Sequence, residues 1–352
     1  MYRIFSHFSR SFPFHLKPKL LNQEGNHGHL RKVYKKISVF QSGLSKLHPK
    51  RDTRIHQTAK SFHIIPDAIN IRHCREADIK TFLQLTRKEG WDNTEFDCRA
   101  VLKLDSSSFI VAADDADTPL GFIVVFDMFS DTCYSGQLIV KDAFRGRGVG
   151  RKLLTALWER IGEKNLCIYS TENLIESYRK QGILLESIRS IAYRGIITSG
   201  CKELKTNENE CDIVPLTDHI WHDLLAYDSI VYKGKSREKI LRLWFVGEYV
   251  YTVVAFSKGK VSGYGSFIKA DDNQYIIRTV FGDNSKVVDE ILDNMLARIP
   301  LGAMLTFVLL ADKEVPSRFS GFEPTIVTQT MSTKFKIETE SDKMFYICYH
   351  FV

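Results

Sequence analysis

The stretch VKDAFRGRGVGR, residues 140–151, lies between a predicted strand and a predicted helix. Glycines recur at every second position in it, at Gly146, Gly148 and Gly150. Glycine lets the backbone approach a ligand closely, and the amides that follow stand at a helix N-terminus, where unpaired N–H groups and the helix dipole favour anions. Positive charge is added by Arg145, Arg147 and Arg151. The stretch therefore predicts a binding site for a pyrophosphate.

Two common phosphate-binding motifs do not match this spacing. A Walker A loop needs Gly-Lys-Ser/Thr at a fixed distance after its first glycine, and none follows Gly146. A dinucleotide fingerprint needs GxGxxG after the early strand of a parallel βαβ unit. From the glycine pattern alone, a turn that merely caps the helix is a serious alternative. The order of the surrounding secondary-structure elements is needed to distinguish a pyrophosphate site from a helix-capping turn.

The flanking sequence predicts a mixed α/β domain over residues 61–199. Apolar residues recur with helical spacing at 75–89 and 148–161, and 172–180 is a shorter helical segment. Apolar runs separated by turn-rich segments predict the strands. These strands are 107–113, 120–126, 136–140, 166–169 and 188–194, the last of which is expected to close the domain.

A second domain is predicted to repeat this order. The polar segment 200–210 is interpreted as a linker, and residues 211–352 follow it. The predicted elements are a helix at 219–226, strands at 249–256, 263–268 and 276–280, a helix at 285–299 and a strand at 304–310. The segment 318–322 then stands opposite 178–183. A repeat of this length is a whole-domain duplication and differs from a solenoid, whose units are far shorter.

The order of strand, Arg-Gly-x-Gly-x-Gly loop, amphipathic helix, strand and short helix with Tyr178 resembles the GNAT acetyltransferase superfamily. The family's loop binds the pyrophosphate of coenzyme A, and it matches Arg145, Gly146, Arg147, Gly148, Val149 and Gly150. The resemblance implies that Leu138, Ile139 and Val140 pair with the pantetheine arm, and that the amide near Leu138 faces the thioester oxygen. It implies acetyl-CoA as co-substrate.

A closer resemblance is to the YitH-like branch, in which an active GNAT domain precedes a divergent one. Glu89-Gly90-Trp91-Asp92 and Ala192-Tyr193-Arg194-Gly195 carry it, together with downstream pieces such as Gly263-Tyr264-Gly265. The implied fold is a pair of tandem GNAT-like domains, the second degenerate. Where the second domain should have the glycine loop it has Gly282-Asp283-Asn284-Ser285-Lys286-Val287. We therefore expect no coenzyme A there, and expect this domain to complete the acceptor pocket.

The resemblance also assigns roles to single residues. Tyr178 lies where the family has the general acid that reprotonates the coenzyme A thiolate, and a phenol stays protonated at neutral pH; the alternative is a tyrosine that only packs on the sheet. Glu89, Trp91 and Asp92 border the acceptor side, although Trp91 in the core is an equally good interpretation. No carboxylate stands at the family's base position, which falls near Tyr134. A water relay, or an amine that arrives neutral, would serve instead.

The distribution of charge and cysteine argues against nucleic-acid-binding and zinc-binding functions. Residues 1–60 hold 13 of the 49 Lys and Arg but only two of the 42 acids, so the rest of the chain has 36 basic and 40 acidic residues. A nucleic-acid binder normally carries its basic excess on the folded domain. The seven cysteines form no CxxC pair and no zinc-like spacing, and no apolar run is long enough to span a membrane. We expect an acetyltransferase for a small-molecule or protein amine, without metal, nucleic acid or membrane insertion; the alternative is a non-catalytic acyl-CoA-binding or regulatory protein.

The first 60 residues are interpreted as a basic leader. Residues 1–23 contain no acid, and Arg3 and Arg10 fall on one helical face with Phe5 and Phe8 on the other. Such a start is typical of a mitochondrial presequence. The alternative is a basic tail without a targeting function, and the protein would then be cytoplasmic. We expect residues 1–60 to carry a fluorescent protein into mitochondria, and Arg3→Glu with Arg10→Glu to abolish import. A diffuse cytosolic signal from the unmutated fusion would contradict the mitochondrial interpretation.

Overall fold

The computed structural model describes residues 69–203 and 210–348, so the leader at 1–60 lies outside the described residues. The first half of the chain forms β1 (Asn70–His73), α2 (Ile79–Lys88), α3 (Glu95–Leu104), β2 (Phe109–Ala113), β3 (Pro119–Phe129), β4 (Thr132–Val140), α4 (Val149–Ile161), β5 (Asn165–Thr171), α5 (Ile175–Arg179) and β6 (Leu185–Ile196). The second half forms β7 (Asp212–Pro215), α6 (Trp221–Val231), α7 (Glu238–Trp244), β8 (Val250–Ser257), β9 (Lys260–Asp271), β10 (Gln274–Gly282), α8 (Ser285–Ala297), β11 (Met304–Leu310), β12 (Glu323–Ser332) and β13 (Met344–Tyr346).

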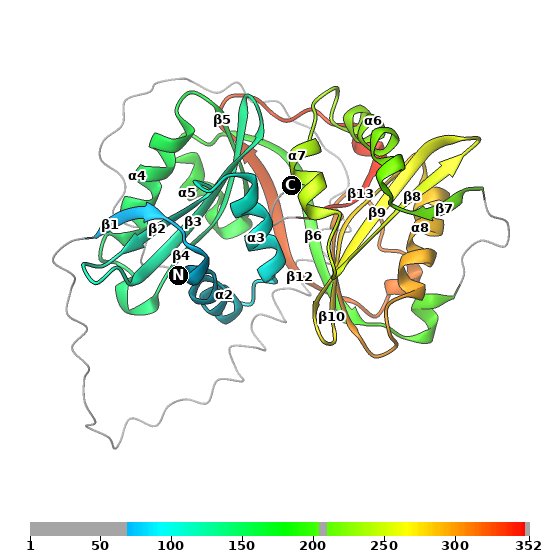
Figure 1. The fold of residues 1–352 in the computed structure, drawn as a ribbon, viewed down its shortest axis with the longest axis horizontal. Coiled ribbons are helices and arrows are strands. Elements are labelled where there is room, and N and C mark those ends of the chain that lie inside the picture. Colours follow the sequence, from blue (N-terminus) through cyan, green and yellow to red (C-terminus); the bar gives the residue numbers. More distant parts are fainter. Residues whose placement is uncertain (1–68, 204–209, 349–352) are drawn as a thin grey trace, which may run out of the picture.

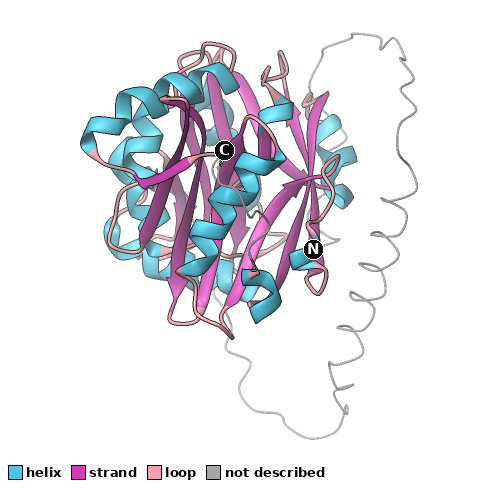
Figure 2. Ribbon diagram, turned by 90° about the vertical axis from the view of Figure 1, so that its right-hand side faces the viewer, coloured by secondary structure: helices cyan, strands magenta, loops and turns pink. Residues whose placement is uncertain are grey.

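Helices cover both faces of one mixed sheet (Figure 2). Strands such as β2 are buried at every position because neither face is open to water. Alternate residues of each strand join different cores. Phe109 and Val111 of β2 pack with α2 and α3, while Ile110 and Ala112 pack with α4. In the second half, α6 and α7 join the α2–α3 core, and α8 lies on the face of α4.

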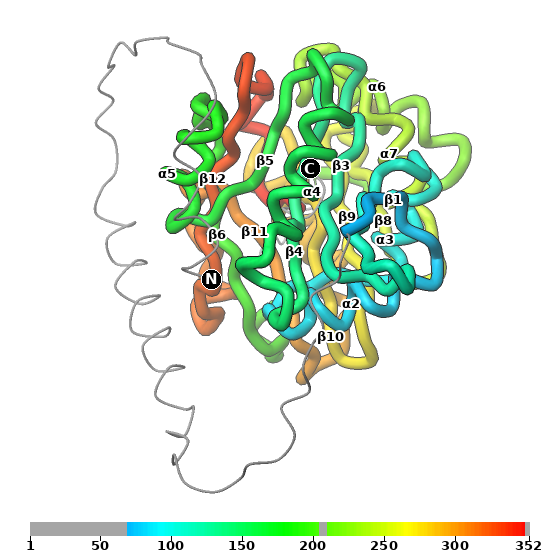
Figure 3. The backbone as a smooth tube through the Cα atoms, turned by 90° about the vertical axis from the view of Figure 1, so that its left-hand side faces the viewer, coloured from blue at the N-terminus to red at the C-terminus, as the bar shows by residue number. Residues whose placement is uncertain are grey.

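The two halves share strands. Within the described residues the sheet has 13 strands in the order β1-β2-β3-β4-β5-β12-β6-β11-β13-β10-β9-β8-β7. β12, from the second half, lies between β5 and β6 of the first (Figures 1 and 3). β6 in turn pairs with β11 of the second half, for example through Gly195 and Leu305. The strand expected at 188–194 is observed as β6, and β12 separates it from β5.

The two parallel strand pairs, β4–β5 and β10–β11, both diverge after a few residues, but only the second gap is filled by another strand. β4 and β5 pair only from Thr132–Asn165 to Ser135–Ile168, and then diverge into a wedge. β10 and β11 likewise pair only from Gln274–Met304 to Ile276–Thr306. In the second half, β13 enters the gap and pairs with both of its neighbours. The wedge of the second half is therefore filled by the chain's own strand.

A buried ion pair ties the halves together. Arg278 of β10 and Asp97 of α3 form it, with exposed fractions of 4% and 7%. Arg278 also donates to the carbonyl of Trp244, at 2.9 Å, and Thr94 donates to the second carboxylate oxygen of Asp97, at 2.6 Å. Such a pair is strongly destabilising to break from one side only, because a buried charge is then left alone. The α2–α3 segment is thus held rigidly against the second half.

Candidate active site

The glycine loop adopts the conformation that its sequence predicts. Gly146 and Gly148 have φ of 75° and 88°, in the left-handed region that favours glycine. A Cβ atom at either position would meet no protein atom within 4 Å, so the space beside the loop is open. The first hydrogen bond of α4 runs from the amide of Lys152 to the carbonyl of Gly148, at 3.1 Å. The amides of Val149 and Gly150 therefore have no acceptor within the helix.

The arginines of the loop divide between two tasks. Arg147 and Arg151 are exposed beside the helix N-terminus. Arg145 is turned back onto the protein, where its Nε donates to the carbonyl of Val140 at 2.9 Å and its guanidinium binds Glu89 at 2.5 Å. Glu89, which we expected on the acceptor side, thus contacts the loop. Arg145 fixes the loop to the end of α2, and a bound anion would be met by the exposed arginines and the free amides.

A bulge in β4 places the predicted pantetheine-binding residues at the open edge of the wedge. The register with β3 shifts between Val124–Gly136 and Phe122–Ile139, and Gln137 has φ of 57° at that point. Leu138 packs with the core under α4, while Ile139 faces the core under α2 and α3. Beyond Ser135 the backbone of β4, through Val140, is no longer paired with β5. Residues 138–140 are therefore not paired with β5 on this side of the strand.

Tyr178 lies on α5, immediately after β5. The left-handed Gly182 ends this helix, with φ of 86°, and the amide of Ile183 donates to the carbonyl of Tyr178 at 3.1 Å. The ring is partly buried in the core under α4, and burial raises the pKa of the phenol. Its hydroxyl has no hydrogen-bond partner among the described residues. Tyr178 is thus protonated at neutral pH and able to donate.

Neither Tyr134 nor the acids of the β3–β4 hairpin are suited to act as the general base. Tyr134, at the family's base position, is 2% exposed, and burial holds the pKa of its phenol well above the ordinary value. Burial pushes the pKa of Asp127 upwards, but the hydrogen bonds from Lys164 and Cys133 outweigh it and lower that pKa. A hydrogen bond from Lys235 lowers the pKa of Asp131. Both carboxylates are engaged in ion pairs at the hairpin between β3 and β4.

Trp91 and Asp92 lie in the connection between α2 and α3. The carboxylate of Asp92 accepts from Arg194 of β6 at 2.5 Å and from Gln274 of β10 at 2.9 Å, so it joins both halves of the chain. Trp91 is partly buried against the α2–α3 core. Asn93, which the sequence analysis missed, accepts from the side chain of Gln137 at 2.8 Å. The only sequence signal for it was its place directly after Trp91 and Asp92.

The second half lacks the features of an anion site at the corresponding helix. The side chain of Asn284 accepts from the amide of Val287 at 3.0 Å, and so caps α8. Asp283 precedes the cap and is bound by Tyr227 at 3.0 Å and Lys343 at 2.5 Å. A Cβ atom at Gly282 would come within 2.8 Å of Val288. The position of the glycine loop is therefore taken by a capped, acidic turn.

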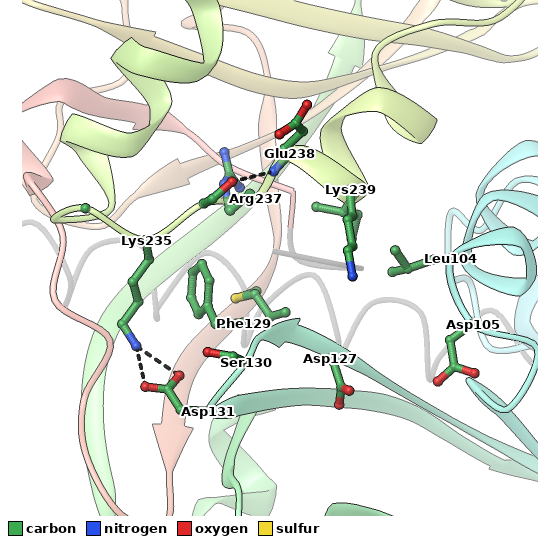
Figure 4. Close-up of a pocket in the computed structure, with 14 residues that line it drawn as sticks. Leu104, Asp105, Asp127, Phe129, Ser130, Asp131, Lys235, Arg237, Glu238 and Lys239 are labelled. Carbon is green, nitrogen blue, oxygen red and sulfur yellow. Dashed lines mark hydrogen bonds and ion pairs between the residues drawn. The ribbon is translucent and has the colours of Figure 1, made fainter. Parts of the chain in front are cut away.

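A cleft of about 850 Å³ opens between the halves (Figure 4). Its walls come from the end of α3, the β3–β4 hairpin and the segment before α7, with Leu104, Phe129 and Ile240 among the apolar lining. Lys239 points into it, and Lys235 binds Asp131 at its edge (Figure 4). This cleft adjoins the start of β4, whereas the glycine loop follows its end. It is therefore distinct from the candidate coenzyme site.

Three further findings concern metal-binding groups, membrane-spanning helices and cysteines among the described residues. No group of three or more His, Cys, Asp or Glu side chains in 69–203 and 210–348 could hold a metal ion. Over the same residues, none of the helices has the length and apolar character needed to cross a membrane. All seven cysteines fall within these ranges and none of them forms a disulfide; six of them are buried. Burial raises the pKa of the Cys133 thiol to about 12, which makes it a poor nucleophile at neutral pH.

Part of the chain matches a known family model. Residues 105–183 match the family model of the acetyltransferase (GNAT) domain. Two curated relatives are each 22% identical: an uncharacterized protein of Caenorhabditis elegans over 217 residues (59% of this chain, 69% of that protein) and holothin acyltransferase of Pseudoalteromonas sp. (strain SANK 73390) over 220 residues (62% and 71%).

Solved structures agree on the fold. A candidate acetyltransferase from Pyrococcus horikoshii has a TM-score of 0.63 at 16% identity, over 84% of this chain and 98% of that chain. A tandem GNAT protein from the clavulanic acid biosynthesis pathway has a TM-score of 0.56 at 13% identity, over 75% and 98%. The predicted fold class, a mixed α/β sheet of GNAT type, is confirmed. Residues 105–183 are therefore similar to a GNAT acetyltransferase domain, and the larger fold around them is one that solved GNAT proteins share.

Proposed function

We propose that this protein is an acetyl-CoA-dependent N-acetyltransferase that acetylates a primary amine by direct attack. The observation that carries the proposal is the open wedge between β4 and β5, with the glycine loop and the N-terminus of α4 beside it. The family match supports acyl transfer in general, and so does the acyltransferase among the relatives. The YitH-like assignment, with a divergent second domain, belongs to the same proposal.

The residues of the wedge suit acetyl-CoA. The amides of Val149 and Gly150 would bind the pyrophosphate, with Arg147 and Arg151 supplying charge. Open space beside Gly146 and Gly148 leaves room for the phosphates. The pantetheine arm would pair with the free edge of β4 at residues 138–140, with the thioester oxygen near the amide of Leu138. The bound thioester supplies an activated acetyl group.

The proposed reaction needs one proton donor on the leaving-group side. The amine nitrogen attacks the thioester carbonyl carbon, a C–N bond forms, and the C–S bond breaks. Tyr178 gives its phenolic proton to the departing thiolate and regains one from solvent. The surplus proton of the amine passes to water. Because the phenol of Tyr178 has a raised pKa, it is present as the acid throughout the neutral range.

Turnover distinguishes this enzyme from a protein that only binds acyl-CoA. The purified chain would be incubated with acetyl-CoA and a metabolite extract, with mass spectrometry of newly acetylated products and a thiol assay for released coenzyme A. We expect acetylated amines that are absent from a control without protein. Tight binding of acetyl-CoA with no acetylated product would instead favour the non-catalytic alternative.

We expect one coenzyme A site per chain. The wedge of the second half is filled by β13, and the side chain of Asn284 already caps α8. Asp283 would also repel a pyrophosphate. Isothermal titration calorimetry of the full chain with coenzyme A should give a stoichiometry of about one. Two equivalent sites would contradict the proposal that the second half has lost this function.

A further inference from the structure

Two amide side chains meet above the bulge of β4 and leave two polar atoms unpaired. The Nε2 atom of Gln137 donates to Oδ1 of Asn93 at 2.8 Å. Asn93 is 5% exposed. Its Nδ2 atom and Oε1 of Gln137 are buried and have no hydrogen-bond partner among the described residues. Buried side-chain polar atoms are nearly always hydrogen-bonded, so two neighbouring exceptions at a candidate active site call for a partner from outside the chain.

The hydrogen-bonding groups that this pair leaves unpaired are the same whichever way the two amides are oriented. Oxygen and nitrogen of an amide are assigned from the hydrogen-bond network, and both could be exchanged. In either orientation, the amide nitrogen of one residue donates a hydrogen bond to the amide oxygen of the other. One NH2 group and one carbonyl oxygen then remain without a protein partner, on two side chains that contact each other.

The surrounding structure holds this pair in place. Asp92, directly before Asn93, is bound by Arg194 and Gln274. Thr94, directly after it, caps α3 by accepting from the amide of Asp97 at 3.1 Å. Gln137 is one of the few non-glycine residues with positive φ, and such conformations are kept where the surroundings fix them.

The pair lies on the side of β4 away from the predicted coenzyme. Leu138 faces the core under α4, whose N-terminus carries the glycine loop. Gln137, the residue before it, instead reaches Asn93 in the α2–α3 connection on the opposite face. A thioester bound in the wedge would thus have the coenzyme on one side of the strand and the Asn93–Gln137 pair on the other. An acceptor that approaches from the side opposite the coenzyme would meet this pair.

Local charge indicates what kind of acceptor the pair would recognise. The two carboxylates that precede Asn93 in this connection are held in ion pairs, Asp92 with Arg194 and Glu89 with Arg145. The pair itself is uncharged. We propose that Asn93 and Gln137 form the acceptor-recognition site, and that the acceptor is an amine carrying an uncharged amide group. The carbonyl of that amide accepts from the free N–H of the pair, and its N–H donates to the free oxygen. This inference rests on the proposed acetyltransferase function.

The test compares amines that differ in the amide alone. Leucinamide carries an amide, leucine a carboxylate, and 3-methylbutylamine neither; spermidine represents polycations. We expect the wild-type kcat/KM for leucinamide to exceed that for 3-methylbutylamine by about tenfold or more, since a site built to hydrogen-bond a group rejects the analogue that lacks it. Leucine and spermidine should be poorer still.

The variants assign that preference to the pair. Asn93→Leu and Gln137→Leu should each reduce the leucinamide advantage to about threefold or less, while the affinity for acetyl-CoA stays within about twofold. Gln329→Leu is the matched control, because Gln329 is a buried amide on β12 that bonds only backbone carbonyls; it should keep the full advantage. Asn93→Asp keeps the shape but adds a charge, and should shift preference towards spermidine. It serves as the second variant if Asn93→Leu fails to fold.

Each other outcome overturns the inference. The pair would not determine acceptor selectivity if the preference for leucinamide persisted in both Asn93→Leu and Gln137→Leu. A wild-type preference for spermidine would show the same. Acetylation of amines from an extract but of none of the four probes would do the same. By contrast, the absence of any acetyl transfer, even to extract amines, would contradict the proposed function itself, so the two failures are distinguishable.

Discussion

Replacing Tyr178 by phenylalanine is expected to slow acetyl transfer by about a hundredfold to ten-thousandfold, the usual effect of losing a general acid. The change removes only the hydroxyl, so the packing of the ring under α4 is kept. Affinity for acetyl-CoA should change little, because the phenol acts on the leaving group rather than on the bound ground state. Single-turnover measurements, in which chemistry limits the rate, are the appropriate check.

The pH profile gives this prediction a second readout. An unperturbed tyrosine ionises near pH 10, and burial raises the pKa of Tyr178 above that. The donor is the protonated phenol, so its contribution is complete below pH 10 and is lost only as the pH rises through the raised pKa. The wild-type rate should therefore show a decline at high alkaline pH that Tyr178→Phe lacks. A mutant with nearly normal turnover would mean that Tyr178 only packs on the sheet.

Replacing Gly148 by valine is expected to abolish measurable binding of acetyl-CoA, a loss of at least about a hundredfold in affinity. A Cβ atom at residue 148 meets no protein atom within 4 Å, so the new side chain projects into the space that the pyrophosphate would occupy. The left-handed conformation adds a cost of about 1–2 kcal/mol for any side chain. Calorimetric titration would measure the affinity, and thermal unfolding would measure the cost in stability.

Gly162 provides a matched control at the other end of the same helix. It also has positive φ, 57°, and open space around its Cβ position. Its ψ of −124° lies outside the left-handed helical region of Gly148, so Gly162→Val should lose at least as much stability and keep normal affinity for acetyl-CoA. Equal losses of affinity in both variants would indicate that strain in α4, rather than a blocked phosphate site, explains the effect. Normal affinity in a folded Gly148→Val protein would indicate that the loop only caps the helix and does not bind the pyrophosphate.

Local patterns were enough to predict the elements that build the coenzyme side of the site. The spacing of apolar residues predicted α4 at 148–161, and it is observed at Val149–Ile161. The strand that ends at Val140 and the positive-φ glycines follow from residue type and neighbouring positions. Helical period and glycine conformation depend on a few consecutive residues, so a sequence can be read for them directly.

The acceptor side could not be predicted because it depends on contacts between distant segments. Asn93 and Gln137 are 44 positions apart, and Asp92 and Gln274 are 182 apart. The helix α3 and the strands β12 and β13 were also missed. β12 carries Thr, Gln and Ser, a composition that predicts a turn-rich surface as readily as a strand. In the sheet its Thr328 lies 2.8 Å from the hydroxyl of Ser190, so the polar groups satisfy one another.

The sequence by itself thus determined that residues 140–151 form a strand–loop–helix unit, since this follows from local backbone geometry. Only the tertiary structure decided which strands become neighbours. β12 fills the place between β5 and β6, and β13 closes the second wedge while the first stays open. Strand pairing is set by hydrogen bonds to whichever edge the rest of the fold leaves free, and no short stretch of β12 or β13 encodes the identity of its partner.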